Sequence, residues 1–146
     1  MISRRKFILS TSGTVALAVA APISTLLQGC TSSGYALNAE VTRDTIVIPL
    51  ATLPDLNQPY AYVRLYVERY TNPFLLFHRD DGELVALQST CSHRGCEVKK
   101  LRTKLECPCH GSEYDLSGEV RKGPAPEPLE RYRVQQFTDR LEILLK

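Results

Sequence analysis

The chain has 146 residues, a length that fits one domain, and its 18 Lys and Arg nearly balance its 16 Asp and Glu for a net charge of +2. This balance excludes a strongly basic nucleic-acid binder and an acidic disordered tail. Five Cys and three His are the unusual features of the composition.

The N-terminus is typical of an export signal. A basic triplet at residues 4–6 precedes 33 uncharged residues, 7–39. The paired arginines resemble the twin-arginine signal, whose pathway exports folded proteins. The motif Leu-Gln-Gly-Cys that ends at Cys30 resembles a lipoprotein cleavage site, so we expect residues 1–29 to be removed and Cys30 to be lipidated. An uncleaved anchor and simple secretion remain open, and all three place the folded part outside the cytoplasm.

The rest of the chain predicts β-structure after a short tether. Residues 30–43 are small and polar and are expected to form the tether. From residue 44 on, short runs of β-branched, aromatic and apolar residues alternate with turn residues, and no window carries a convincing helical stripe. The predicted strands are 45–50, 61–67, 74–78, 83–88, 132–137 and 141–145. Hairpin turns are expected at 80–82 and 138–140.

A stretch between the predicted hairpins, residues 89–130, has a different composition. It is poor in aliphatic residues and rich in Cys, His, Gly and Pro, so burial alone cannot hold it together. It therefore needs a covalent staple or a metal. Its two motifs are Cys91-Ser-His93-Arg-Gly-Cys96 and Cys107-Pro-Cys109-His110-Gly-Ser112. Thiolates and neutral imidazoles are ligands suited to iron–sulfur clusters, zinc or copper.

Zinc binding, nucleophilic catalysis and plain disulfides each fit these motifs less well. A structural zinc site usually uses Cys-x2-Cys pairs, and Cys91-x-His93 is an awkward spacing for one tetrahedral ion. A Cys–His nucleophile needs fewer residues than two similar loops supply. Two plain disulfides leave both histidines without a role.

The motifs resemble those of the Rieske iron–sulfur proteins, and the resemblance extends over residues 44–146. The matching elements are Cys-x-His, from Cys91 to His93, and Cys-x2-His, from Cys107 to His110. The resemblance implies one [2Fe–2S] cluster, with the two Cys on one iron and the two His on the other. It also implies an all-β fold, in which an antiparallel β-sandwich base carries an inserted cluster-binding subdomain at about residues 89–130.

The resemblance implies roles for further residues. Cys96 and Cys109 would form a disulfide that joins the two loops, as in the quinol-oxidising branch of the family. Ser112 and Tyr114 match the hydroxyl residues that donate hydrogen bonds near the cluster and raise its potential. His110, with His93 beside it, would contact quinol and couple electron transfer to proton transfer.

Two features bear on the partner. Arg94 departs from the apolar residue usual in the quinol-oxidising branch, at a position near the docking surface. The basic segment 99–104 is expected to be either a solvated hairpin face or a docking patch for an acidic cytochrome.

The sequence thus predicts a membrane-tethered periplasmic electron-transfer protein, lipid-anchored at the outer face of the cytoplasmic membrane. It would take an electron from quinol at a cytochrome b-type subunit and pass it to a c-type cytochrome, as a subunit of a reductase-type complex rather than an enzyme alone. Twin-arginine export fits this hypothesis, since a cluster built in the cytoplasm must cross the membrane inside a folded protein. The alternatives are the Rieske subunit of a periplasmic molybdenum oxidase of the arsenite oxidase type, a stand-alone carrier, and a lipoprotein with a structural zinc site.

Overall fold

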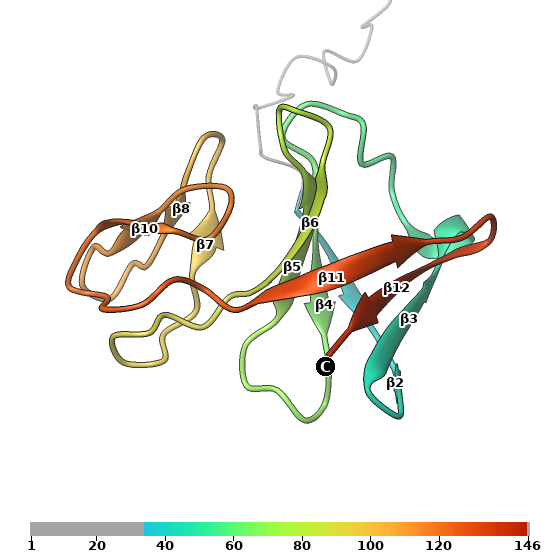
Figure 1. The fold of residues 1–146 in the computed structure, drawn as a ribbon, viewed down its shortest axis with the longest axis horizontal. Helices are drawn as coiled ribbons and strands as arrows, with labels where there is room; N and C mark the ends of the chain where they lie inside the picture. The colour runs from blue at the N-terminus through green and yellow to red at the C-terminus, as the bar shows by residue number, and fades with distance from the viewer. Residues whose placement is uncertain (1–33, 146) are drawn as a thin grey trace, which may run out of the picture. The chain divides into compact units, whose positions relative to one another are not determined.

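The computed structural model describes residues 34–145, and their secondary structure is almost entirely β (Figure 1). The larger sheet consists of β1 (Gly34–Asn38), β2 (Val41–Thr42), β3 (Thr45–Pro49), β4 (Tyr62–Tyr66), β5 (Phe74–His78), β6 (Leu84–Gln88), β11 (Arg131–Gln136) and β12 (Arg140–Leu144). The smaller sheet consists of β7 (Lys99–Lys100), β8 (Leu105–Glu106), β9 (Glu113–Tyr114) and β10 (Val120–Lys122). One 3-10 helix, η1, covers Leu50–Thr52. The all-β prediction is therefore confirmed, and no helix in residues 34–145 is long and apolar enough to span a membrane.

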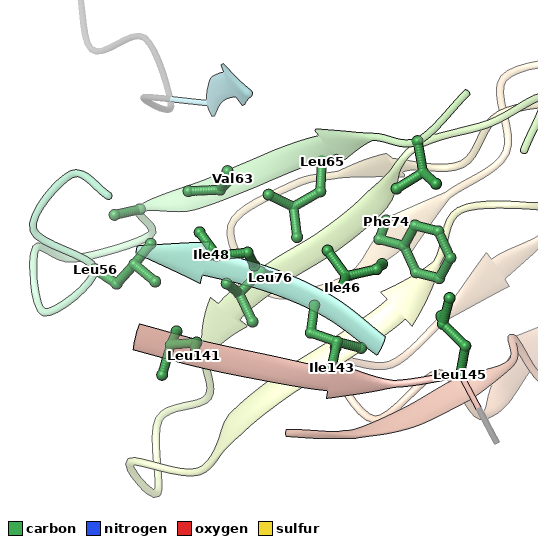
Figure 2. Packing of buried hydrophobic residues seen from close by; sticks show 13 residues of the cluster. Ile46, Ile48, Leu56, Val63, Leu65, Phe74, Leu76, Leu141, Ile143 and Leu145 are labelled. Atoms are coloured by element: carbon green, nitrogen blue, oxygen red, sulfur yellow. The ribbon is translucent and has the colours of Figure 1, made fainter. Parts of the chain in front are cut away.

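The larger sheet runs in the order β1-β4-β5-β6-β11-β12-β3-β2 and folds over into two layers. Strand β11 changes partner along its length: Arg131 and Tyr132 pair with β6, whereas residues 133–136 pair with β12. Figure 1 shows β11 crossing from one half of the sheet to the other. The interior is filled by alternating apolar side chains of both halves (Figure 2): Ile46, Ile48, Val63, Leu65, Phe74, Leu76, Leu141, Ile143 and Leu145.

Strand β5 supplies side chains to two cores. Residues 74–77 are all buried, and alternate side chains point to opposite faces of a strand. Phe74 and Leu76 face the interior of the sandwich, whereas Leu75 and Phe77 belong to a second core. That core packs residues of the 89–130 subdomain against the outer face of β5 and β6, including Val98, Leu105, Tyr114, Ala125 and Leu129. The packing of these buried apolar side chains therefore holds the smaller sheet against the larger one.

Part of the segment expected to be a tether is strand. Strand β1 pairs in parallel with β4, from Gly34 opposite Tyr62 to Asn38 opposite Tyr66, and β2 forms a hairpin with β3. A Cβ atom at Gly34 would lie 2.5 Å from the end of the Tyr62 ring, so a larger residue here would require that ring to move. The predicted signal and lipidation site, residues 1–30, lie outside the described part of the chain.

Candidate metal centre

Two loops of the small subdomain have the same backbone hydrogen bonds. In each, the amide of the fourth residue after a Cys donates to the Cys carbonyl, and the Cys amide donates to the carbonyl of the fifth. These bonds are Gly95 to Cys91 (2.8 Å), Gly111 to Cys107 (3.0 Å), Cys91 to Cys96 (2.9 Å) and Cys107 to Ser112 (2.9 Å). Gly95 and Gly111 have φ of 74° and 72°, a left-handed conformation that favours glycine. The repeated spacing therefore encodes a repeated tight turn.

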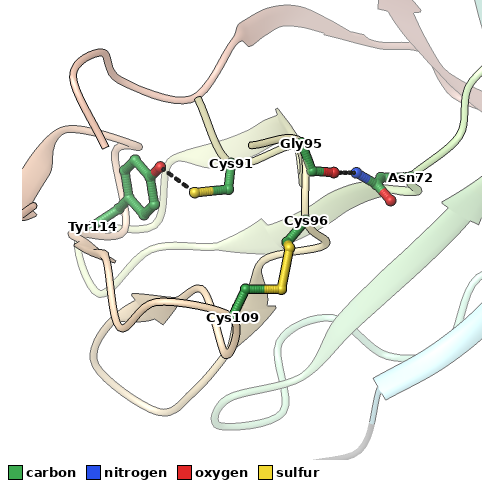
Figure 3. The surroundings of a disulfide bond; sticks show 6 residues. All are labelled: Asn72, Cys91, Gly95, Cys96, Cys109 and Tyr114. Atoms are coloured by element: carbon green, nitrogen blue, oxygen red, sulfur yellow. Dashed lines mark hydrogen bonds between the residues drawn. A yellow bond between two sulfur atoms is a disulfide. The ribbon is translucent and has the colours of Figure 1, made fainter. Parts of the chain in front are cut away.

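A disulfide joins the two loops (Figure 3). It links Cys96 to Cys109, with 6.5 Å between their Cα atoms. The sulfur of Cys107 lies within 4.8 Å of both disulfide sulfurs. Because these two sulfurs are bonded to each other, Cys107 is the member of this group that could ligate a metal.

The loops bring two free thiols and two imidazoles together. Cys91 and Cys107 are reduced and buried, with 2% and 1% of their surfaces exposed. The rings of His93 and His110 lie edge to face, with centroids 4.7 Å apart. His110 is exposed, whereas His93 is half-buried.

One atom of this group indicates a metal directly. The Nδ1 of His93 is buried and has no hydrogen-bond partner among the described residues. A buried ring nitrogen without a partner is costly, and a metal ion would satisfy it. Two thiolates and two imidazoles are also the donor set of a [2Fe–2S] cluster with mixed ligands. The four residues therefore fit such a cluster.

Two hydroxyl side chains, those of Tyr114 and Ser112, lie near the thiol of Cys91. Tyr114, fully buried, donates a hydrogen bond from its hydroxyl to the Cys91 sulfur at 3.3 Å (Figure 3). Burial, together with this bond, raises the pKa of Tyr114 to about 12, so the phenol keeps its proton at neutral pH. Ser112 accepts a hydrogen bond from the Ala125 amide at 3.0 Å, which leaves its own hydrogen available to donate.

The two thiols differ in acidity. Burial raises the pKa of Cys91, but hydrogen bonds from Tyr114 and the His93 backbone outweigh it, so this pKa lies below its ordinary value. Burial raises the pKa of Cys107, and the neighbouring Cys91 sulfur raises it too, although backbone hydrogen bonds from Cys109 and His110 act in the opposite direction. The donors around Cys91 favour a negative charge on sulfur.

Sequence reasoning missed one residue that supports the first loop. Asn72 precedes β5, is 8% exposed, and donates to the Gly95 carbonyl at 2.8 Å and to Thr90 Oγ1 at 3.2 Å. It connects the base to the cluster loop (Figure 3). The Asn-Pro pair at 72–73 indicated only a turn, because nothing local reveals a partner 23 residues away.

The proline-containing segment 123–128 is held against the first loop. The Ser92 hydroxyl donates to the Glu127 carbonyl at 2.7 Å and accepts from the Glu127 amide at 3.2 Å. With Ala125 bonded to Ser112, this segment covers both loops.

The cations of the basic segment 99–104 differ in their surroundings. Lys100 is buried, and Lys104 makes salt bridges with two glutamates of the same sheet. The Arg102 guanidinium lies 4.4 Å from the centroid of the Tyr60 ring. Lys99 alone is left as an exposed lysine of this segment.

Comparisons with known proteins agree with this geometry. The family model described as Rieske [2Fe-2S] domain matches residues 48–135. The chain is 29% identical over 150 residues to the cytochrome b6-f complex iron-sulfur subunit 2 of Trichormus variabilis, covering 97% of this chain and 84% of that protein. It is 33% identical to the subunit of the same name from Nostoc sp., covering 70% of this chain and 60% of that protein. Among solved structures, it is similar to the plasma membrane Rieske protein PetC3 from Synechocystis, with 34% identity and a TM-score of 0.45, covering 49% of this chain and 75% of that one.

Proposed function

Because the chain belongs to the Rieske [2Fe–2S] family, we propose that it takes single electrons from a quinol bound at a cytochrome b-type subunit and passes them to a c-type cytochrome. It carries one [2Fe–2S] cluster, which supplies a site that takes up and releases one electron. Relatives that are subunits of cytochrome b6-f complexes support electron transfer in a complex of the bc type. The observation that carries the proposal is the pair of matching, disulfide-linked loops, which carry two buried thiols and two imidazole rings that contact each other.

The proposed ligands are Cys91 and Cys107 for one iron and His93 and His110 for the other. Neutral imidazoles in place of two thiolates remove two negative charges, so accepting an electron costs less. Centres of this type lie at roughly −150 to +300 mV, against about −400 mV for plant-type ferredoxins. The donor Tyr114 favours the upper part of this range, because its hydrogen bond stabilises negative charge on sulfur.

His110 is the proposed contact for quinol. Its side chain is exposed, whereas His93, whose ring contacts it, is half-buried. An imidazole that uses one ring nitrogen for iron leaves the other free to carry or release a proton: with the proton it donates a hydrogen bond, and without it the nitrogen accepts one from a quinol hydroxyl. Because the His110 side chain is exposed, a quinol could reach this ring nitrogen.

Lipid attachment at Cys30 is the proposed membrane link. It is supported by the export signal and the cleavage motif in the sequence, which are typical of proteins held at the outer face of the cytoplasmic membrane.

Arg94 favours a second candidate, a subunit of a periplasmic molybdenum oxidase. Its side chain is exposed next to His93 and has no partner among the described residues. A free cation there suits a polar protein surface better than an apolar quinol pocket, because entering the pocket would desolvate it.

Purification of the tagged full-length chain from native membranes tests the proposal. We expect a cytochrome b-type haem subunit to co-purify, and quinol to reduce the protein only when that subunit is present. A molybdenum subunit in its place would favour the second candidate. A colourless preparation that contains zinc would contradict both.

A further inference from the structure

Lys100 is the only buried charged side chain among the described residues, with 4% of its surface exposed. Lysine is rarely buried without an acidic partner, yet no carboxylate in the described part of the chain forms a salt bridge with it. Its Nζ lies 5.0 Å from the centroid of the Phe77 ring and 5.6 Å from that of Tyr62. It also donates to the Leu101 carbonyl at 3.3 Å. The ammonium therefore lies between the small sheet and the base.

Strand pairing connects this charge to the metal centre. Lys100 pairs with Leu105, and Leu105 pairs with Tyr114, so the three form one row across β7, β8 and β9. All three are buried toward the base, and the row ends at the Tyr114 hydroxyl on the Cys91 sulfur. With neighbouring strands about 4.8 Å apart, the backbone of Lys100 lies roughly 10 Å from that of Tyr114. Apolar side chains fill the space around this row, so solvent ions screen the charge weakly.

Packing alone gives no reason for a cation here. Burial lowers the pKa of Lys100, opposed by the charge of Asp80 at the β5–β6 turn. Aromatic faces and one carbonyl compensate part of the lost hydration. An apolar side chain of similar length would be as stable or more so, because it would avoid this cost. A buried charge that stability does not require is a candidate for an electrostatic role.

The other face of the same sheet provides a contrast. Lys99 points outward and is exposed, opposite Glu106, and Lys104 is paired with Glu106 and Glu113. Lys99 is solvated, and the half-buried charge of Lys104 is balanced by two carboxylates, so the effect of these charges at a distance is small. Lys99 and Lys100 of β7 therefore carry the same charge, but only Lys100 is buried.

We propose that the buried ammonium of Lys100 raises the reduction potential of the [2Fe–2S] centre, because it favours the more negative, reduced form. The inference rests on the proposed function and adds a residue that tunes the centre without touching it. A unit charge at about 12–15 Å, at an effective dielectric constant of about 20, changes the equilibrium constant for electron uptake roughly six- to tenfold.

The test compares Lys100→Met with Lys99→Met in the full-length protein. Both remove one positive charge from β7, and methionine fits the apolar surroundings of Lys100. Midpoint potentials are measured by redox titration followed by electron paramagnetic resonance, at low and high salt. We expect Lys100→Met to take up an electron roughly six- to tenfold less favourably at both salt concentrations. Lys99→Met should change little, and Lys100→Arg should keep the potential near the wild-type value.

Equal potentials for wild type and Lys100→Met would overturn the proposal, as would a shift no larger than that of Lys99→Met. If Lys100→Met fails to assemble its centre, Lys100→Gln provides the same comparison with a polar neutral side chain. Absence of any redox-active centre in the wild type would contradict the proposed function instead, so the two failures are distinct.

Discussion

Removing the Tyr114 hydroxyl should lower the midpoint potential while the metal centre stays assembled. The hydroxyl donates to the Cys91 sulfur at 3.3 Å, and its high pKa keeps it a donor throughout the neutral range. A hydrogen bond to a charged group contributes about 1.5–3 kcal/mol, of which only the difference between the oxidised and reduced states affects the potential. If that difference is roughly 0.5–1.4 kcal/mol, a one-electron potential falls by about 20–60 mV, since a tenfold change corresponds to about 59 mV.

Tyr114→Phe is a clean test because the ring keeps its place in the second core. Ser112→Ala is less clean, since the Ala125 amide would lose its acceptor and stability would fall as well. Tyr132→Phe is the matched control: its hydroxyl donates to Glu130, away from both loops. The assay is a potentiometric titration of the full-length protein followed by electron paramagnetic resonance. An unchanged potential in Tyr114→Phe, or an equal shift in Tyr132→Phe, would refute the reasoning.

Three further predictions concern stability. Replacing Cys96 and Cys109 together by Ser should lower the free energy of unfolding by about 3 kcal/mol in denaturant titrations, because the disulfide closes a loop of sequence separation 13. Equal denaturation midpoints for this variant and the wild type would show that the disulfide does not stabilise the fold. Burial alone would raise the pKa of Asp115, but hydrogen bonds from backbone amides and from Arg121 outweigh it, so the pKa in the folded protein lies below its ordinary value. The ionised Asp115 therefore stabilises the folded protein above the unfolded pKa of about 3.9, and this stabilisation is lost as the pH falls through the lower folded pKa. Asp115→Asn should therefore cost about 1 kcal/mol at pH 7 and nearly nothing at acid pH, and a pH-independent difference in thermal unfolding would be inconsistent with this account. Asn72→Ala should destabilise the folded protein by about 1–3 kcal/mol and speed the loss of the visible absorbance of the iron–sulfur cluster. An unchanged rate of this loss would show that Asn72 does not support the first loop.

Local sequence patterns predicted the elements that depend on local chemistry. The run 74–78 and its return strand were predicted because an apolar run and an Asp-Gly turn leave few alternatives. The two tight turns that begin at Cys91 and Cys107 were predictable because a fixed spacing of Cys, His and Gly is typical of such turns.

Features that depend on distant partners were not predictable. Strand β1 exists because β4 offers an edge, and the Gly, Ala and Asn that alternate with Tyr35 and Leu37 give it only a weak strand signal of its own. Burial of Lys100 rather than Lys99 depends on which face of a two-residue strand meets the base. Asn72 became a support only when folding placed it against Gly95.

The ligand set of the metal centre is the central claim, and spectroscopy of the full-length protein with ¹⁵N-labelled histidine tests it most directly. We expect a [2Fe–2S] centre that is paramagnetic when reduced and shows hyperfine couplings to nitrogens of two histidine rings, one from His93 and one from His110. A reduced cluster without histidine nitrogen coupling, or a silent protein that contains zinc, would contradict it.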